Sequence, residues 1–139
     1  MLNQNNNLIA VIFILIILLL GVGIFLLANL KLSKKLNKSF YHLQLMKIKK
    51  LLEQANYTIV AMESDKLLDS TLKELGIKGS TMGERLKNST SLGLNLNDVW
   101  WAHKLRNRAA HEVGYNISAV NASKMVKILE VSLKKLGAI

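Results

Sequence analysis

The feature that most constrains this chain is an uninterrupted apolar run near its N-terminus. From Leu8 to Ala28 the sequence reads LIAVIFILIILLLGVGIFLLA, and none of these 21 residues is charged or strongly polar. At about 1.5 Å per residue, a helix of this length spans about 30 Å, the thickness of the hydrocarbon core of a bilayer. The run therefore predicts a transmembrane helix over residues 8–30, preceded by a short extracytoplasmic N-terminus at residues 1–7.

A cleaved secretory signal is the main alternative for this segment. Signal peptides combine a basic start, an apolar region of roughly 7–15 residues and small residues before the cleavage site. Here the first 30 residues contain no Lys or Arg, the apolar run is longer, and Leu26-Leu27-Ala28-Asn29 is a poor cleavage sequence. These features favour a membrane anchor over a signal peptide.

The charges around the apolar run predict its orientation. Residues 1–7 carry no charged side chain, whereas residues 31–50 hold seven lysines and no acid. Because cytoplasmic flanks collect Lys and Arg, we expect a single-pass protein of the cell (inner) membrane, with its N-terminus outside and its C-terminal domain in the cytoplasm. The basic juxtamembrane segment at residues 31–39 is expected to contact anionic lipid headgroups through Lys31, Lys34, Lys35 and Lys38.

The formal net charge of +10 also suggests nucleic acid as a partner. From Leu51 to Ile139, however, 12 Lys and Arg face nine Asp and Glu, which leaves a net charge of 12 − 9 = +3. Contact with headgroups therefore accounts for most of the charge. The chain has no Cys, which excludes disulfides, thiolate metal sites and a thiol nucleophile. It also lacks a nucleotide-binding glycine loop, and no cofactor is expected.

Beyond residue 38 the apolar residues recur at helical spacing. The expected elements are a long helix at 39–75, a short helix beginning near Thr81, a loop at 88–97, and two helices at 98–113 and 118–136. The apolar face of the long helix includes Ala55 and Ile59, and that of the third helix includes Val113. The pattern predicts an all-α fold, with one transmembrane helix and a small antiparallel four-helix bundle over residues 40–139.

Polar side chains concentrate in the helix expected at 98–113. His103, Asn107 and His111 are four residues apart and share one face of that helix, and Arg106 lies one residue off that line. A guanidinium can hold two phosphate oxygens, and an imidazole can accept or donate a proton near neutral pH. Such a set could carry out metal-free RNA cleavage, in which a 2′-hydroxyl attacks the adjacent phosphate. His103 and His111 are too far apart in sequence to suggest a metal site.

The segment Arg106-Asn107-Arg108-Ala109-Ala110-His111 resembles the R-x4–6-H signature of the HEPN superfamily (higher eukaryotes and prokaryotes nucleotide-binding). The sequence WWAHKLRN at 100–107, the segment AMESDKLL at 61–68 and the amphipathic closing helix are also similar to HEPN-type domains. The likeness covers roughly residues 40–137. It implies a four-helix up-down bundle that often forms a homodimer. It also implies a metal-independent ribonuclease, as in many members, or an RNA-binding or scaffolding module, as in others.

Carried over residue by residue, the resemblance implies that Arg106 holds the scissile phosphate, Asn107 orients it and His111 is the acid/base. The supporting polar candidates are His103, Glu63 and Glu112.

Two other interpretations remain open. In one, Arg106 pairs with Glu112, Glu63 or Asp65 in a structural polar network. The domain is then a non-catalytic dimerisation or scaffold module that recruits a protein partner to the membrane. In the other, the chain is a lipid-surface protein whose lysine run senses anionic headgroups. At most one of Trp100 and Trp101 could stack on a base, and core packing is the favoured role for both.

Overall fold

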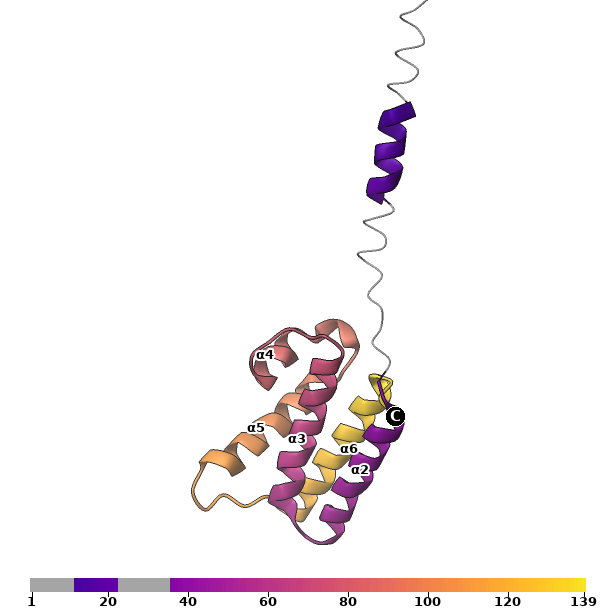
Figure 1. Cartoon of the computed structure of the whole chain (residues 1–139). Helices are drawn as coiled ribbons and strands as arrows, with labels where there is room; N and C mark the ends of the chain where they lie inside the picture. Colours follow the sequence, from indigo (N-terminus) through magenta and orange to yellow (C-terminus); the bar gives the residue numbers. More distant parts are fainter. Residues whose placement is uncertain (1–11, 23–35) are drawn as a thin grey trace, which may run out of the picture. The chain divides into compact units, whose positions relative to one another are not determined.

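The C-terminal part of the chain folds as a helical bundle (Figure 1). The computed structural model describes residues 12–22 and 36–139, and every regular element among them is a helix. The compact unit Lys34–Ile139 contains five α-helices and one 3-10 turn. These are α2 (Lys38–Glu53), α3 (Tyr57–Glu74), α4 (Met82–Lys87), η1 (Thr90–Leu92), α5 (Leu96–His111) and α6 (Ala119–Lys135). The predicted all-α bundle is confirmed.

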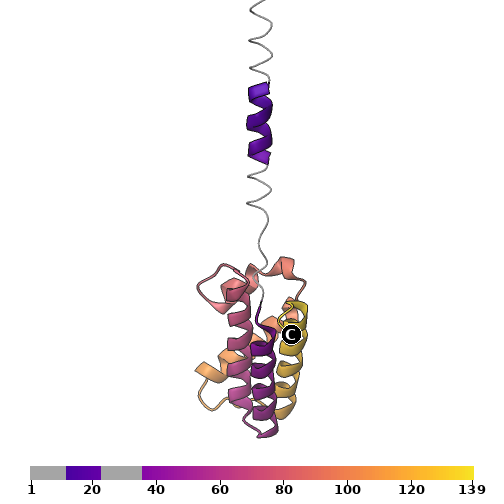
Figure 2. The same ribbon diagram turned by 45° about the vertical axis from the view of Figure 1, so that its right-hand side comes forward.

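Helices α3 and α6 form the centre of this bundle. They pack against each other, α2 packs against both on one side, and α5 packs against both on the other. Figures 1 and 2 show α2, α3 and α6 side by side, with α5 inclined across them. The largest fully buried side chains come from four of the helices: Tyr41, Leu72, Leu86, Met125 and Leu133. Burial of one such side chain contributes roughly 1.5–3 kcal/mol.

The long helix predicted at 39–75 is in fact two helices, α2 and α3. The chain turns between them at Ala55, whose φ is 59°. The N–H of Ala55 bonds to the carbonyl of Leu52, and the N–H of Asn56 bonds to that of Leu51. This hydrogen-bond pair is a Schellman motif, which usually has Gly at the left-handed position. With Ala there, the sequence carries no stop signal. Ala55 and Ile59, expected on the apolar face, are exposed.

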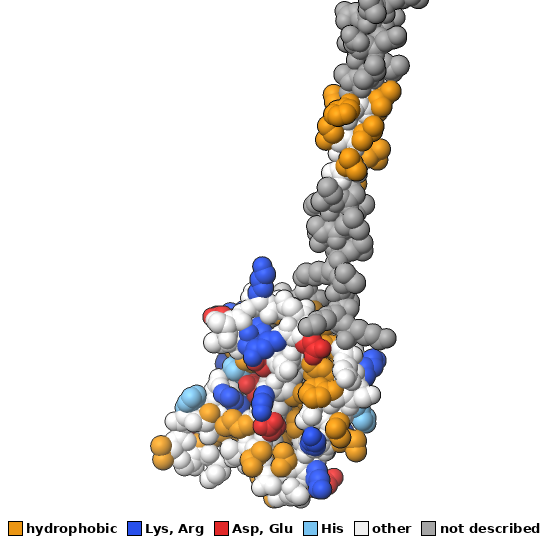
Figure 3. All heavy atoms as spheres, viewed as in Figure 1, with side chains coloured by type: hydrophobic (Ala, Val, Ile, Leu, Met, Phe, Trp, Pro, Cys, Tyr) orange, Lys and Arg blue, Asp and Glu red, His pale blue; other side chains and the backbone are white. Residues whose placement is uncertain are grey.

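The predicted transmembrane helix over residues 8–30 is not supported. Its described part, residues 12–22, is helical and covered by apolar side chains (Figure 3). Among the described residues, no helix has both the length and the apolar character needed to cross a membrane. This part of the fold prediction is therefore wrong.

Some residues named in that prediction cannot be placed. The N-terminus at 1–7 and the lysines at 31, 34 and 35 lie outside the described residues, whereas Lys38 is the first residue of α2.

The other predicted helix ends are close to the observed ones. Thr81 caps α4, Asn95 caps α5 and Ser118 caps α6, each through its side-chain oxygen. Helix α5 ends at His111, two residues earlier than expected, because Glu112 adopts an extended conformation. Val113, predicted on the buried face of this helix, is therefore fully exposed.

Two helix ends of the same type offer a matched pair of substitutions. Gly76 ends α3 with φ 77° and with the same two backbone bonds that surround Ala55. We expect Ala55→Gly to raise the free energy of unfolding by about 0.5–1 kcal/mol, because it removes the steric cost of left-handed Ala. Gly76→Ala should lower it by about 1 kcal/mol for the same reason. Urea unfolding measures both changes, and a shift of the same sign in both variants would contradict this account.

Candidate functional site

Four polar side chains form a closed ring between α3 and α5. Nδ1 of His103 lies 2.7 Å from Oδ1 of Asp65, and Nε2 of the same imidazole lies 3.1 Å from Nδ2 of Asn107. Nη1 of Arg106 donates to Oδ1 of Asn107 at 3.0 Å. Nε of Arg106 lies 3.6 Å from Oδ2 of Asp65, which closes the ring as an ion pair.

The donors of this ring all point the same way around it. Arg106 donates to the Asn107 amide oxygen, and the amide nitrogen of Asn107 can donate to Nε2 of His103. Nδ1–H of His103 can then donate to the carboxylate of Asp65. This pattern fits a neutral imidazole with its proton on Nδ1. The ring therefore holds Asn107 and Arg106 in fixed orientations.

A second polar pair fastens the short helix α4 to α3 beside the ring. Nε and Nη2 of Arg85 donate to the two oxygens of Asp69 at 2.6 and 3.1 Å. Nη1 of Arg85 donates to the carbonyl of Gly79, and Lys73 pairs with Asp69 at 2.8 Å. Burial raises the pKa of Asp69, but the hydrogen bonds from Arg85 and Lys73 outweigh it and hold that pKa below its ordinary value.

The ring and this pair line one open pocket of about 560 Å³ between α3, α4 and α5. We call it the polar pocket. Its charged lining consists of four basic side chains and two carboxylates: Lys66, Lys73, Arg85, Arg106, Asp65 and Asp69. In Figure 3, basic and acidic side chains alternate over α3 and α4 on the face shown. The excess of positive charge suits an anionic ligand such as a phosphodiester.

The structure brings together only part of the predicted site. Arg106, Asn107 and His103 line the polar pocket. His111 is exposed at the last turn of α5, two turns beyond His103, or about 12 Å along the helix. None of the hydrogen bonds of the ring involves it.

The two glutamates of the predicted site also lie outside the polar pocket. Glu63 pairs with Lys66 at 3.6 Å, and Glu112 accepts from Nε of Arg108. Of the three acids considered as partners for Arg106, the structure selects Asp65.

Sequence reasoning missed the pair Asp69–Arg85. A signal was present, because Asp65 and Asp69 are four residues apart and so share one face of α3. Two acids on an otherwise apolar face indicate basic partners from another element. The chain has a single Arg outside the motif helix, Arg85, which made it the natural candidate.

The described residues offer no cluster of three or more His, Asp or Glu side chains that could hold a metal ion. The polar pocket offers a ligand the Arg, Lys, His and Asn side chains that line it.

The fold and this site together define an all-helical bundle domain with a basic, hydrogen-bonded pocket on its motif helix. No protein-family model, curated protein or solved structure matches the chain. The HEPN-like assignment therefore stays a prediction based on the motif and the order of the helices.

Proposed function

We propose that this domain is a HEPN-like RNA-binding module that cleaves RNA without a metal ion. In this reaction a 2′-oxygen attacks the neighbouring phosphorus, and its proton passes to an imidazole. The bond from phosphorus to the 5′-oxygen breaks, that oxygen takes a proton from water, and the imidazolium returns its proton to the hydroxide that is left. The products are a 2′,3′-cyclic phosphate and a 5′-hydroxyl.

The state of Arg106 carries this proposal. Its side chain is 32% exposed, and the guanidinium donates one hydrogen bond, to Asn107. Its Nε is buried without a hydrogen-bond partner in the described part of the chain. Since a guanidinium has five N–H donors, most of them remain for a ligand of the polar pocket. A fixed, incompletely bonded Arg is well suited to hold a phosphate through two oxygens.

His111 is the better candidate for the proton transfer, and His103 for positioning. Both imidazole nitrogens of His103 are engaged in the polar ring, the closed ring of Asp65, His103, Arg106 and Asn107. His111 is exposed in the last turn of α5. An imidazole that gains and loses a proton during turnover needs such an accessible place.

The test is cleavage of a panel of RNAs by the purified full chain in EDTA. We expect cleavage by the wild-type protein, and we expect Arg106→Ala to lower kcat/KM by about 100–1,000-fold, the usual cost of losing a donor to developing negative charge. Arg108→Ala is the matched control. Arg108 belongs to the same motif and helix, but it pairs with Glu112 on the surface and should be dispensable.

A well-folded chain that cleaves none of the RNAs would refute the ribonuclease proposal and favour the non-catalytic module. One observation supports that second candidate. Helix α2 exposes three large apolar side chains at spacings of three residues, namely Phe40, Leu43 and Met46. Such a stripe is typical of a surface that associates with another protein.

A further inference from the structure

Two more pockets continue from the polar pocket across α5. The first is lined by Asn97, Trp100, Trp101 and Lys104, and we call it the tryptophan pocket. The second lies between the start of α5 and α6, and we call it the lysine pocket. Their volumes are each about 540 Å³.

Direct contacts connect the three pockets. The indole of Trp100 contacts the imidazole of His103 edge to face, with their centroids 5.7 Å apart. A residue of the tryptophan pocket therefore touches a residue of the hydrogen-bonded ring. On its other side, Nζ of Lys124 lies 4.3 Å above the ring of Trp101. Lys124 is itself part of the lysine pocket. These two contacts place residues of the three pockets side by side, from His103 through Trp100 and Trp101 to Lys124.

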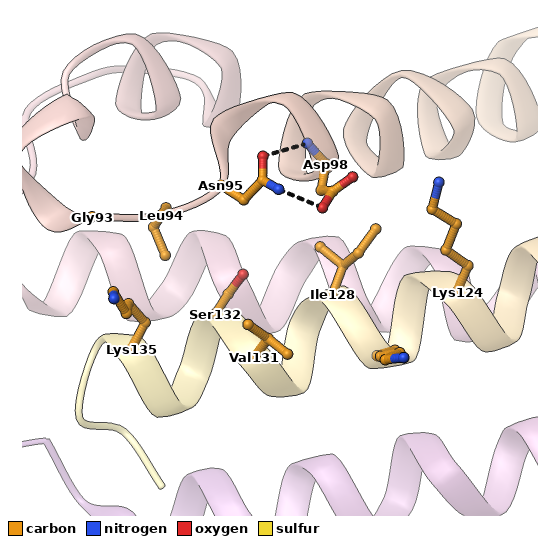
Figure 4. Close-up of a pocket in the computed structure, with 10 residues that line it drawn as sticks. Gly93, Leu94, Asn95, Asp98, Lys124, Ile128, Val131, Ser132 and Lys135 are labelled. Atoms are coloured by element: carbon orange, nitrogen blue, oxygen red, sulfur yellow. Dashed lines mark hydrogen bonds between the residues drawn. The ribbon is translucent and has the colours of Figure 1, made fainter.

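The lysine pocket combines an apolar floor with basic ends (Figure 4). Ile128 and Val131 lie along α6, and Leu94 faces them from the loop before α5. Lys124 and Lys135 lie at opposite ends of this floor, and Lys127 adds a third ammonium group.

Asp98 is the acid among the residues that line the lysine pocket, and its carboxylate accepts a hydrogen bond of 2.7 Å from Asn95. With three lysines and one acid, the lining has an excess of positive charge. Among the described residues, neither Lys127 nor Lys135 takes part in an ion pair.

We propose that this surface is the binding track for single-stranded RNA, which runs from the polar pocket over Trp100 and Trp101 to the lysine pocket. This inference rests on the proposed function and specifies its substrate. Phosphates would contact Lys104, Lys124, Lys127 and Lys135, while unpaired bases would stack on an indole ring or pack on the apolar floor. Basic grooves with aromatic platforms are the usual means of binding single strands.

The track selects against double-stranded RNA. Bases of a duplex are stacked on one another and cannot reach an indole face, whereas a single strand can turn its bases toward the protein. The apolar floor points the same way, because a duplex would present only its charged backbone and sugar edges to Ile128 and Val131.

Binding of a fluorescein-labelled 12-nucleotide RNA, measured by anisotropy at several salt concentrations, tests the track. The RNA carries 2′-O-methyl groups, so that it lacks the attacking hydroxyl and stays intact. We expect Lys127→Ala/Lys135→Ala to weaken binding by about tenfold or more near 0.1 M salt. The slope of log K against log salt should fall by about 1.4, or about 0.7 per lost phosphate contact. Trp101→Ala should weaken binding about tenfold.

Lys47→Ala/Lys50→Ala is the matched control. Both lysines are exposed on α2, outside the three pockets, and their loss changes the net charge equally. We expect nearly wild-type binding from this variant. Because Trp101 is half-buried, the melting curve of Trp101→Ala is recorded to check that this variant folds. The test of the track is decided by Lys127→Ala/Lys135→Ala, since both of these lysines are exposed.

The outcomes separate the track from the proposed function. If the wild-type protein binds the single strand but both lysine pairs weaken binding equally, the track is wrong and RNA binding stands. Equal affinity for the matching duplex also overturns the track. If the wild-type protein neither binds nor cleaves RNA, the proposed function fails, and the track fails with it.

Discussion

Replacing Arg85 by Leu should lower the free energy of unfolding by about 3 kcal/mol, since removal of one partner leaves the charge of the other poorly compensated. The side chain of Arg85 is only 4% exposed, and its two hydrogen bonds to Asp69 are the main support of that carboxylate. Lys73 still reaches Asp69, which limits the loss. Denaturant unfolding followed by circular dichroism measures the change.

The matched control is Arg108→Leu. Arg108 makes the same kind of ion pair, with both oxygens of Glu112 at 3.1 Å, but its side chain is 53% exposed. Exposed pairs contribute about 0–1 kcal/mol, so the same substitution should have little effect here. If Arg85→Leu and Arg108→Leu lowered the free energy of unfolding equally, burial would not determine how much these ion pairs stabilise the fold.

The Arg85 pair also makes stability depend on pH in acid. The pKa of Asp69 is lower in the folded chain than its ordinary value of 3.8, so the unfolded chain binds the proton more tightly. The stabilisation from this carboxylate is therefore complete well above pH 3.8 and is lost as the pH falls through the lower, folded pKa. In Arg85→Leu this loss should be smaller, and unfolding curves between neutral pH and pH 3 would show it.

Replacing His111 by Ala should lower the rate of RNA cleavage by about 100–10,000-fold, the usual contribution of a general acid or base. This prediction depends on the proposed function. His111 is exposed and belongs to none of the hydrogen bonds of the polar ring, so its loss should leave the free energy of unfolding nearly unchanged. The measurement combines cleavage in EDTA with urea unfolding of the same preparations.

His103→Ala is the informative comparison because it should lower stability more, and cleavage less, than His111→Ala. Its loss leaves the partly buried carboxylate of Asp65 without its closest partner, which should cost about 1–3 kcal/mol of stability. Cleavage should fall less than in His111→Ala, since Arg106 keeps its bond to Asn107. A larger loss of cleavage from His103→Ala than from His111→Ala would move the acid/base role to His103.

Local patterns predicted much of the bundle correctly. The helix expected at 118–136 is observed as α6, which buries Ala122, Met125, Leu129 and Leu133, and the short helix expected near Thr81 is observed as α4. These features depend on residues three or four positions apart, which a sequence displays directly. The break at Ala55 was missed because no local residue marks it.

The sequence by itself determined the helical class, most of the helix ends and the residues on the polar face of α5. The tertiary structure decided which acid meets Arg106, that Arg85 fastens α4 beside the site, and that His103 rather than His111 joins the ring. It also did not support the transmembrane span, because no helix among the described residues is long and apolar enough to cross a membrane. The reason is general: contacts between residues within one helix follow from spacing, whereas Asp65 and His103 are 38 residues apart and meet only when α3 and α5 pack.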